Sequence, residues 1–295
     1  MTDPGLFGPA SVTWRVHGDP VLWVGGLRAL LLQALHPGAM EGLARNADIR
    51  LDPWGRLMRT AGYVGTVTFG STQQAETAGA AVRRVHQRLD VDDPHLMRWV
   101  HCCLVDSFLT TATRAGTRLS ADEADRYVDE QARLAPLVGV TAASVPHSVH
   151  ALTAYFADIQ PELQLSAAAR DAARLVVIPP MPMWVQLVTP ARVGWTAVAA
   201  IAVGSLPGWA RRLYRLPGLP MTDLAAGAAL RVLAVSLRAV PDRYREGPHL
   251  RAARDRLDGT DPLLKGGAAA PGEGRQRARG TRHTDRPAPV ERAHR

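Results

Sequence analysis

The residues whose types and spacing could do chemistry form a short run that starts at Arg56. Its polar members are Arg56, Arg59, Thr60 and Tyr63. Residues three, four and seven apart share one side of an α-helix, so a helix here would carry two guanidiniums, a hydroxyl and a phenol on one face. Such a face predicts a site for a large anionic ligand.

A single histidine, His86, follows in the next predicted helix. Small and apolar residues recur there at helical spacing and share its side of the helix: Ala75, Ala78, Gly79, Val82, Val85 and Leu89. The smallest of them would leave room beside the imidazole for a flat, bulky group. An imidazole in an apolar, roomy site suits an iron porphyrin as an axial ligand. The same pattern fits a core histidine hydrogen-bonded to a carbonyl, so both interpretations stay open.

The elements that must position these side chains begin at local capping signals. Asp19, Asp52 and Asp93 each precede a proline, which places an acidic N-cap before a residue that needs no amide hydrogen. Ser120 and Glu123 have the spacing of a capping box. These signals predict four helix starts.

Further apolar periodicity predicts helices over 21–35, 53–68, 146–159, 166–177, 190–203, 209–215, 222–239 and 248–257. Alternating apolar and polar runs with hairpin turns do not occur. The expected fold is therefore all-α and globular.

A helix over 98–112 is apolar on nearly every side and should lie at the centre. His101 and Asp106 are its ionisable exceptions. Because a buried charge is costly unless it is paired, Asp106 can support the site by pairing with Arg56, Arg59 or His86. A purely structural ion pair is the alternative.

Composition allows one folded domain. The chain has 295 residues, of which 46% are hydrophobic, and a net charge of +8. The segment 264–295 holds eight Lys/Arg and three acidic residues and so carries +5 of that charge. It is rich in Gly, Pro and Ala, which predicts a folded domain over 1–263 and a disordered basic tail over 264–295. The tail has no aromatic residue to stack on bases, so no specific nucleic-acid partner is expected.

The cysteines and the start of the chain favour a cytoplasmic, soluble protein. Cys102 and Cys103 are adjacent, which suits small buried residues better than a disulfide. No basic segment with an apolar run opens the sequence as a secretory signal would. The apolar stretch 193–209 is interrupted by Gly and Pro and too short to span a bilayer, although it can touch a membrane surface or line an apolar pocket.

A non-haem metal site is disfavoured by spacing. His36, His86, His95 and His101 lack the close intervals of zinc or di-iron helix motifs. His36, before Pro37, is expected to cap the end of its helix, and His95 to face solvent.

Taken in order, these segments closely resemble the DUF2236 family, the catalytic domain shared by latex-clearing rubber oxygenases and fungal MpaB-type oxygenases. The resemblance runs from about Phe7 to Leu257 and rests on these runs: Trp14-Arg15-Val16, Gly25 to Pro37, Gly55 to Thr60, Phe69-Gly70, Val82 to His86, and Trp99 to Ser107.

The resemblance implies an all-helical, globin-like protein that holds haem b, with His86 as the proximal iron ligand. Rubber oxygenases carry an Arg-x-x-Lys-Thr element over the haem, and here Arg59 replaces the lysine between Arg56 and Thr60. A guanidinium stays protonated and ligates iron poorly, so a lysine-closed state is not expected. The family's distal glutamate aligns by counting with Met40, so either the adjacent Glu41 serves as the base or the chemistry differs.

The resulting hypothesis is a haem-dependent oxygenase that acts with O₂ on a small hydrophobic, isoprenoid or otherwise unsaturated substrate and draws on an electron donor. Arg56 and Thr60 would hold the haem propionates or stabilise bound dioxygen. Arg59 is expected among the catalytic residues, and Tyr63 among those that bind the cofactor. Two alternatives stay open. One is a non-catalytic haem or gas-binding protein, and the other is a helical scaffold without a cofactor.

Overall fold

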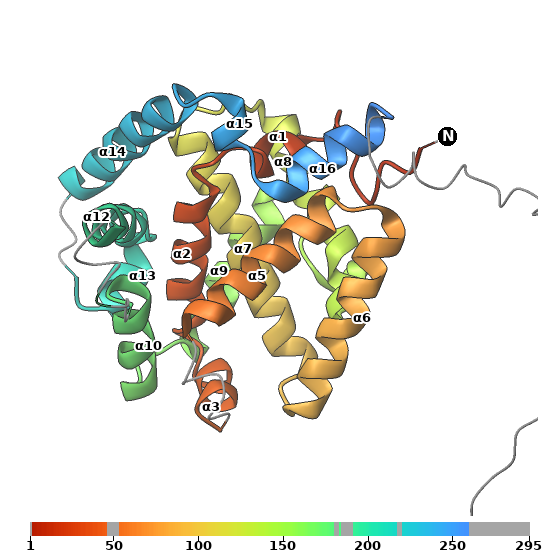
Figure 1. Cartoon of the computed structure of the whole chain (residues 1–295). Helices are drawn as coiled ribbons and strands as arrows, with labels where there is room; N and C mark the ends of the chain where they lie inside the picture. The colour runs from red at the N-terminus through yellow and green to blue at the C-terminus, as the bar shows by residue number, and fades with distance from the viewer. Residues whose placement is uncertain (1, 46–52, 180–182, 184–190, 217–219, 260–295) are drawn as a thin grey trace, which may run out of the picture.

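A computed structural model describes residues 2–45, 53–179, 183, 191–216 and 220–259 (Figure 1). The α-helices are α1 (Val12–His17), α2 (Leu22–Gln33), α3 (Pro37–Arg45), α5 (Pro53–Phe69), α6 (Thr72–Arg88), α7 (Pro94–Arg114), α8 (Ala121–Gln131), α9 (Val149–Ile159), α10 (Ala167–Val177), α12 (Ala191–Gly204), α13 (Gly208–Leu213), α14 (Pro220–Arg238), α15 (Asp242–Arg245) and α16 (Pro248–Leu257). The 3₁₀ segments are η1 (Ala132–Val138), η2 (Ala142–Ser144) and η3 (Gln160–Glu162). No strand occurs in these described ranges, which confirms the all-α prediction.

Local capping by side chains explains where several helices begin. The Asp93 side chain accepts the His95 N–H at 2.8 Å, and α7 starts at the next residue, Pro94. Ser120 and Glu123 form the predicted capping box of α8. The start predicted at Asp19 and Pro20 was wrong, because Asp19 Oδ1 accepts the Val21 N–H at 3.1 Å in a turn and α2 begins only after Val21.

The core forms where α2 packs along α7 at the middle of the molecule (Figure 1). Trp99 and Leu27 are 0% and 1% exposed, and the Trp99 indole N–H donates to the Gln33 carbonyl at 3.2 Å. Cys102 and Cys103 are also fully buried, as predicted. Burial raises the pKa of both thiols, so they stay protonated and act as apolar core groups.

The sequence did not predict α3. Helix α2 does end before His36, but a new helix starts directly at Pro37, and the Met40 N–H donates to the His36 carbonyl at 3.2 Å. Proline suits a first helical position because it needs no amide partner there. The expected capping role of His36 was wrong: both of its ring nitrogens are buried, and neither forms a hydrogen bond with a described residue.

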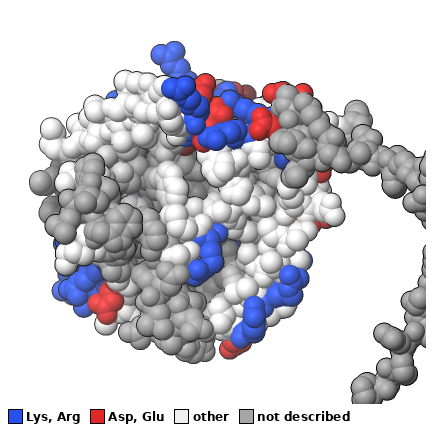
Figure 2. Space-filling view, in the orientation of Figure 1, with Lys and Arg blue, Asp and Glu red and all other residues white. Residues whose placement is uncertain are grey.

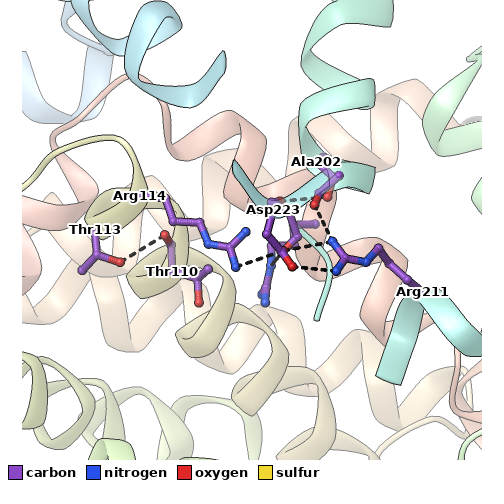
Figure 3. Close-up of polar contacts among 9 residues, drawn as sticks. Thr110, Thr113, Arg114, Ala202, Arg211 and Asp223 are labelled. Carbon is purple, nitrogen blue, oxygen red and sulfur yellow. Dashed lines mark hydrogen bonds and ion pairs between the residues drawn. The ribbon is translucent and has the colours of Figure 1, made fainter. Parts of the chain in front are cut away.

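A bidentate ion pair fastens the helices at the other side of the core onto α7 (Figure 3). Arg211 of α13 donates to both carboxylate oxygens of Asp223 in α14, at 3.0 and 2.8 Å. Arg114 of α7 approaches the same carboxylate at 3.5 Å. Arg211 is only 5% exposed and also donates to the Gly204 carbonyl at 3.0 Å, so the network joins α7, α12, α13 and α14.

The apolar stretch that begins at Val193 forms most of α12, which packs on α2, α10 and α14. Together with α2 and α14 it lines an apolar groove of about 370 Å³ that includes Trp23, Trp195 and Leu233. Among the described helices, none combines the length and the apolar character needed to cross a membrane. The predicted basic tail, 264–295, lies outside the described residues.

Candidate functional site

The site residues lie on a helical hairpin made by α5 and α6. Ser71 starts α6 with a capping box: its hydroxyl accepts the Gln74 N–H at 3.2 Å, and the Gln74 side chain accepts the Ser71 N–H at 2.8 Å. The two helices pack together near this turn and diverge away from it (Figure 1). The hairpin thus has a closed end at Ser71 and an open end near the start of α5 and the end of α6.

The closed end is filled by protein. Ala75 is fully buried against Val67 and Leu137, and Tyr63 and Ala78 pack on the same cluster. A Cβ on Gly79 would lie 2.9 Å from the Cβ of Leu137 in η1. The small residues of α6 therefore serve close helix packing. The expectation that they leave room for a flat ligand was wrong, because η1, which is distant in sequence, occupies that space.

The open end is different. In Figure 2 the face of the molecule is hollowed near its centre, in the region where Figure 1 has α5 and α6 diverging in front of α7. A basic side chain lies at the edge of this hollow (Figure 2).

His86 lies near the C-terminal end of α6 and is half-buried. Its carbonyl accepts the Val91 N–H at 3.0 Å, which folds the following turn back against the helix end. Nδ1 of its ring is shielded from solvent. On α5, Thr60 is half-buried and Arg59 is exposed, whereas the Arg56 side chain lies outside the described part of the chain.

Tyr63 contributes a partly enclosed phenol to the predicted face. Its ring is half-buried beside Ala78 and Leu137, and its hydroxyl is buried without a hydrogen bond to any described residue. Burial raises the pKa of Tyr63 to about 12, while the nearby Arg83 guanidinium acts in the opposite direction. The phenol therefore stays protonated at neutral pH and can donate a hydrogen bond.

Asp106 pairs with a residue that the sequence did not single out as its partner. Nη1 of Arg28 lies 2.7 Å from Oδ2 of Asp106 and 2.7 Å from Oγ of Ser107, and Nε donates to the Ser205 carbonyl at 3.1 Å. Arg28 is only 3% exposed. The structure thus places Asp106 in an ion pair between the two central helices, which is the structural alternative. The signal was present in the sequence, since Arg28 is a lone charge in the apolar helix α2.

The position that counting assigns to a distal base is apolar. Met40 is 6% exposed and packs with Ala34 and Ala169. Glu41, the next residue of α3, is exposed. His101 of α7 is 8% exposed, and burial lowers its pKa to about 4, so it carries a neutral imidazole at physiological pH.

A second large groove lies away from these residues. About 780 Å³ in volume, it is lined by charged groups that include Asp19, Arg238, Glu246 and Arg254. Figure 2 shows charged side chains gathered along this upper rim, over α15 and α16. Neither this groove nor the apolar groove beside α12 includes His86 or Thr60.

Comparison with known proteins matches residues 14–239 to the family model described as ER-bound oxygenase mpaB/B'/rubber oxygenase, catalytic domain. No curated protein and no solved structure matches the chain. The globin-like arrangement therefore stays a prediction. The matched range includes α5, α6 and α7, which carry the candidate residues. The chain thus belongs to the family of mpaB-type and rubber oxygenase catalytic domains.

Proposed function

We propose that this oxygenase domain depends on haem b and acts with O₂ on a small hydrophobic, unsaturated substrate. The observation that carries the proposal is the half-buried imidazole of His86, on α6, at the open end of a hairpin whose other helix contributes Thr60 and Arg59. A haem, when bound, would supply redox-active iron that binds dioxygen, chemistry that protein side chains do not offer alone.

The described residues fit such a group in three respects. An imidazole nitrogen is a common haem ligand, and His86 is neither fully buried nor fully exposed. Tyr63 presents a buried hydroxyl that has no hydrogen bond with a described residue and could donate to a carboxylate. The hollow between the diverging helices gives the group a place to enter (Figure 2).

Each side chain then has a defined task. Nε2 of His86 would bind the metal. Arg56 and Arg59 would pair with propionate carboxylates, because a guanidinium offers paired donors that match a carboxylate. Thr60 and Tyr63 would donate hydrogen bonds. Asp106 would act on the site only indirectly, by holding α2 and α7 together through Arg28.

The proposal also names a base, a substrate class, an electron donor and a location. Glu41 is the carboxylate nearest in sequence to the expected base and would accept a proton from the substrate. Because the Glu41 side chain is exposed, bound substrate or adjacent residues would have to shield it from water during this proton transfer. The same proposal includes an apolar substrate and an electron donor. It also includes a cytoplasmic location and contact with a membrane surface.

The test is an absorption spectrum of the full chain supplied with haem, oxidised and then reduced, for the wild type, His86→Ala and His147→Ala. We expect a Soret band in the wild type that is lost or shifted in His86→Ala. His147 is exposed and bonded to Asp129 at 2.7 Å, so its variant should match the wild type. No Soret band, or the same band in His86→Ala, would refute the proposed ligand.

A second measurement separates catalysis from binding. Oxygen consumption by the haem-loaded chain, measured with an unsaturated apolar compound, should exceed the rate without it. Reversible ligand binding without oxygen consumption would instead support the haem or gas sensor.

A further inference from the structure

Three potential metal ligands meet on the side of α7 where that helix begins. His36 lies between α2 and α3, His95 lies in the first turn of α7, and Glu162 ends η3. Nε2 of His95 lies 2.9 Å from Oε2 of Glu162, and Nε2 of His36 lies 3.6 Å from the same oxygen. One ligand atom from each residue lies within 4.8 Å of the other two.

These separations suit a small cation. Zinc bonds histidine nitrogen and carboxylate oxygen at about 2.0–2.2 Å, so two ligands of a tetrahedral zinc ion lie about 3.4 Å apart. The two separations above lie on either side of that value, and a slight spread of His95 from Glu162 would admit the ion. Two histidines and a glutamate are also a known ligand set for zinc with an open fourth position.

His36 gives an independent indication. It is only 6% exposed, and both of its ring nitrogens are buried without a hydrogen bond to any described residue. A buried imidazole normally satisfies its nitrogens, since each one left unpaired costs free energy. The hydrogen bond between His95 and Glu162 leaves both nitrogens of the His36 ring without a hydrogen bond to a described residue.

The three ligands are held by separate hydrogen bonds. The Gln164 N–H donates to the Leu35 carbonyl at 2.9 Å and so fastens the end of η3 beside His36. The Trp99 indole fastens α7 to the end of α2 at 3.2 Å, and its ring lies 6.1 Å from that of His36. Asp93 fixes the main chain of His95. The ligands are thus arranged before any ion binds, which lowers the entropic cost of binding.

We propose that His36, His95 and Glu162 bind a divalent transition-metal cation of the zinc class, with the fourth position open to water. His95 and Glu162 are 47% and 50% exposed at their side chains, so an ion can enter from solvent. The site is separate from the haem oxygenase proposal and uses none of its residues. Its occupation would fasten the junction of α2 and α3, the start of α7 and the end of η3 together.

The test is calorimetric titration of the haem-free full chain with Zn²⁺ alone, for the wild type, His95→Ala, Glu162→Gln and His147→Ala. His147 is the matched control, because it is an exposed histidine bonded to a carboxylate, Asp129, without a described third ligand. Both ligand variants alter exposed side chains, so the fold should persist. We expect binding in the wild type and in His147→Ala. The ligand variants should bind at least about 10-fold more weakly, since even groups outside the ligand shell cost that much.

Cobalt gives a second readout. Co²⁺ added to the wild type should produce the visible bands of a four-coordinate site, and His36→Gln should abolish them even if that variant is less stable. Equal zinc affinity in the wild type, His95→Ala and Glu162→Gln would overturn the proposal. So would the absence of zinc binding to the wild type. Neither result would bear on the Soret band tested above.

Discussion

The guanidinium of Arg28 lies 2.7 Å from the carboxylate of Asp106, and this contact joins the two helices that form the centre of the protein. Arg28 is almost fully enclosed, and its other donors reach Ser107 and the Ser205 carbonyl. The guanidinium is removed from water and hydrogen-bonded to protein groups instead. Removal of either partner would therefore leave the other charge without compensation.

Arg28→Met should therefore destabilise the protein strongly. The change leaves the Asp106 carboxylate without its partner and removes the donor to the Ser205 carbonyl, so we expect a loss of about 2–4 kcal/mol in the free energy of unfolding, measured in urea. Arg15→Gln is the control: Arg15 pairs with Glu123 at the surface, at 44% and 33% exposure, and its loss should cost less than about 1 kcal/mol. Equal effects of the two changes would contradict a buried role for Arg28.

Two glycines of the hairpin should respond oppositely to alanine. Gly79→Ala places a methyl group 2.9 Å from Leu137 and must push η1 away from α6, which we expect to cost about 1–2 kcal/mol. Gly62→Ala meets nothing within 4 Å and should stabilise α5 by up to about 1 kcal/mol, because alanine has the higher helix propensity. Thermal unfolding of both variants checks the pair. Stabilisation by Gly79→Ala would mean that η1 does not pack as closely as described.

Acid should destabilise the protein through His17. This ring is buried, with Nδ1 2.8 Å from the Thr68 hydroxyl and Nε2 3.0 Å from the Tyr127 hydroxyl, and burial lowers its pKa from 6.5 to about 3. The unfolded chain therefore takes up a proton below pH 6.5, whereas the folded chain does not until about pH 3. Stability is lost as pH falls between these values, by about 1.4 kcal/mol per pH unit.

The measurement is the urea midpoint from pH 6.5 down to pH 5 in the wild type and His17→Gln. The variant should lose stability less steeply. His147→Gln is the control, since the hydrogen bond to Asp129 raises the pKa of His147 and its contribution is lost as pH rises instead. Identical slopes in the wild type and His17→Gln would show that His17 is not buried as a neutral ring.

Tyr63→Phe distinguishes a structural from a ligand-binding hydroxyl. The Tyr63 hydroxyl is buried without a described hydrogen bond, so its removal should leave the haem-free protein equally stable or stabilise it by about 1 kcal/mol. In the haem-loaded protein the same change should weaken haem retention or shift the absorption bands. A large loss of stability without haem would mean that the hydroxyl already has a partner within the protein.

Arg59→Lys should introduce a pH-dependent spectrum. A guanidinium remains protonated and has no lone pair for iron, whereas a lysine amine can lose its proton and bind. We expect the oxidised, haem-loaded variant to change its absorption bands as pH rises, and the wild type not to. Arg88→Lys, at an exposed position near the end of α6, is the control and should behave as the wild type. A spectrum of Arg59→Lys that is constant with pH would place Arg59 away from the metal.

Much of the fold could be predicted because helix ends depend on neighbouring residues. Ser120 and Glu123 complete their capping box within four residues. Asp93 caps α7 by accepting the His95 N–H, and Pro94 follows it as the first helical residue. Where such a signal failed, at Asp19, the same side chain formed a turn instead. The candidate site was predicted less completely. Helical spacing shows which residues share one face of a helix, but it does not show which residues of α5 contact which residues of α6.

By itself, the sequence determined the all-helical fold, the apolar central helix and the family, since each depends on periodicity or on an ordered set of local motifs. Only the tertiary structure decided which side chains meet. It paired Asp106 with Arg28, filled the space beside Gly79 with Leu137, and brought Glu162 to His95. These contacts join segments far apart in the chain. Their partners are set by how helices pack, and helical spacing carries no information on that.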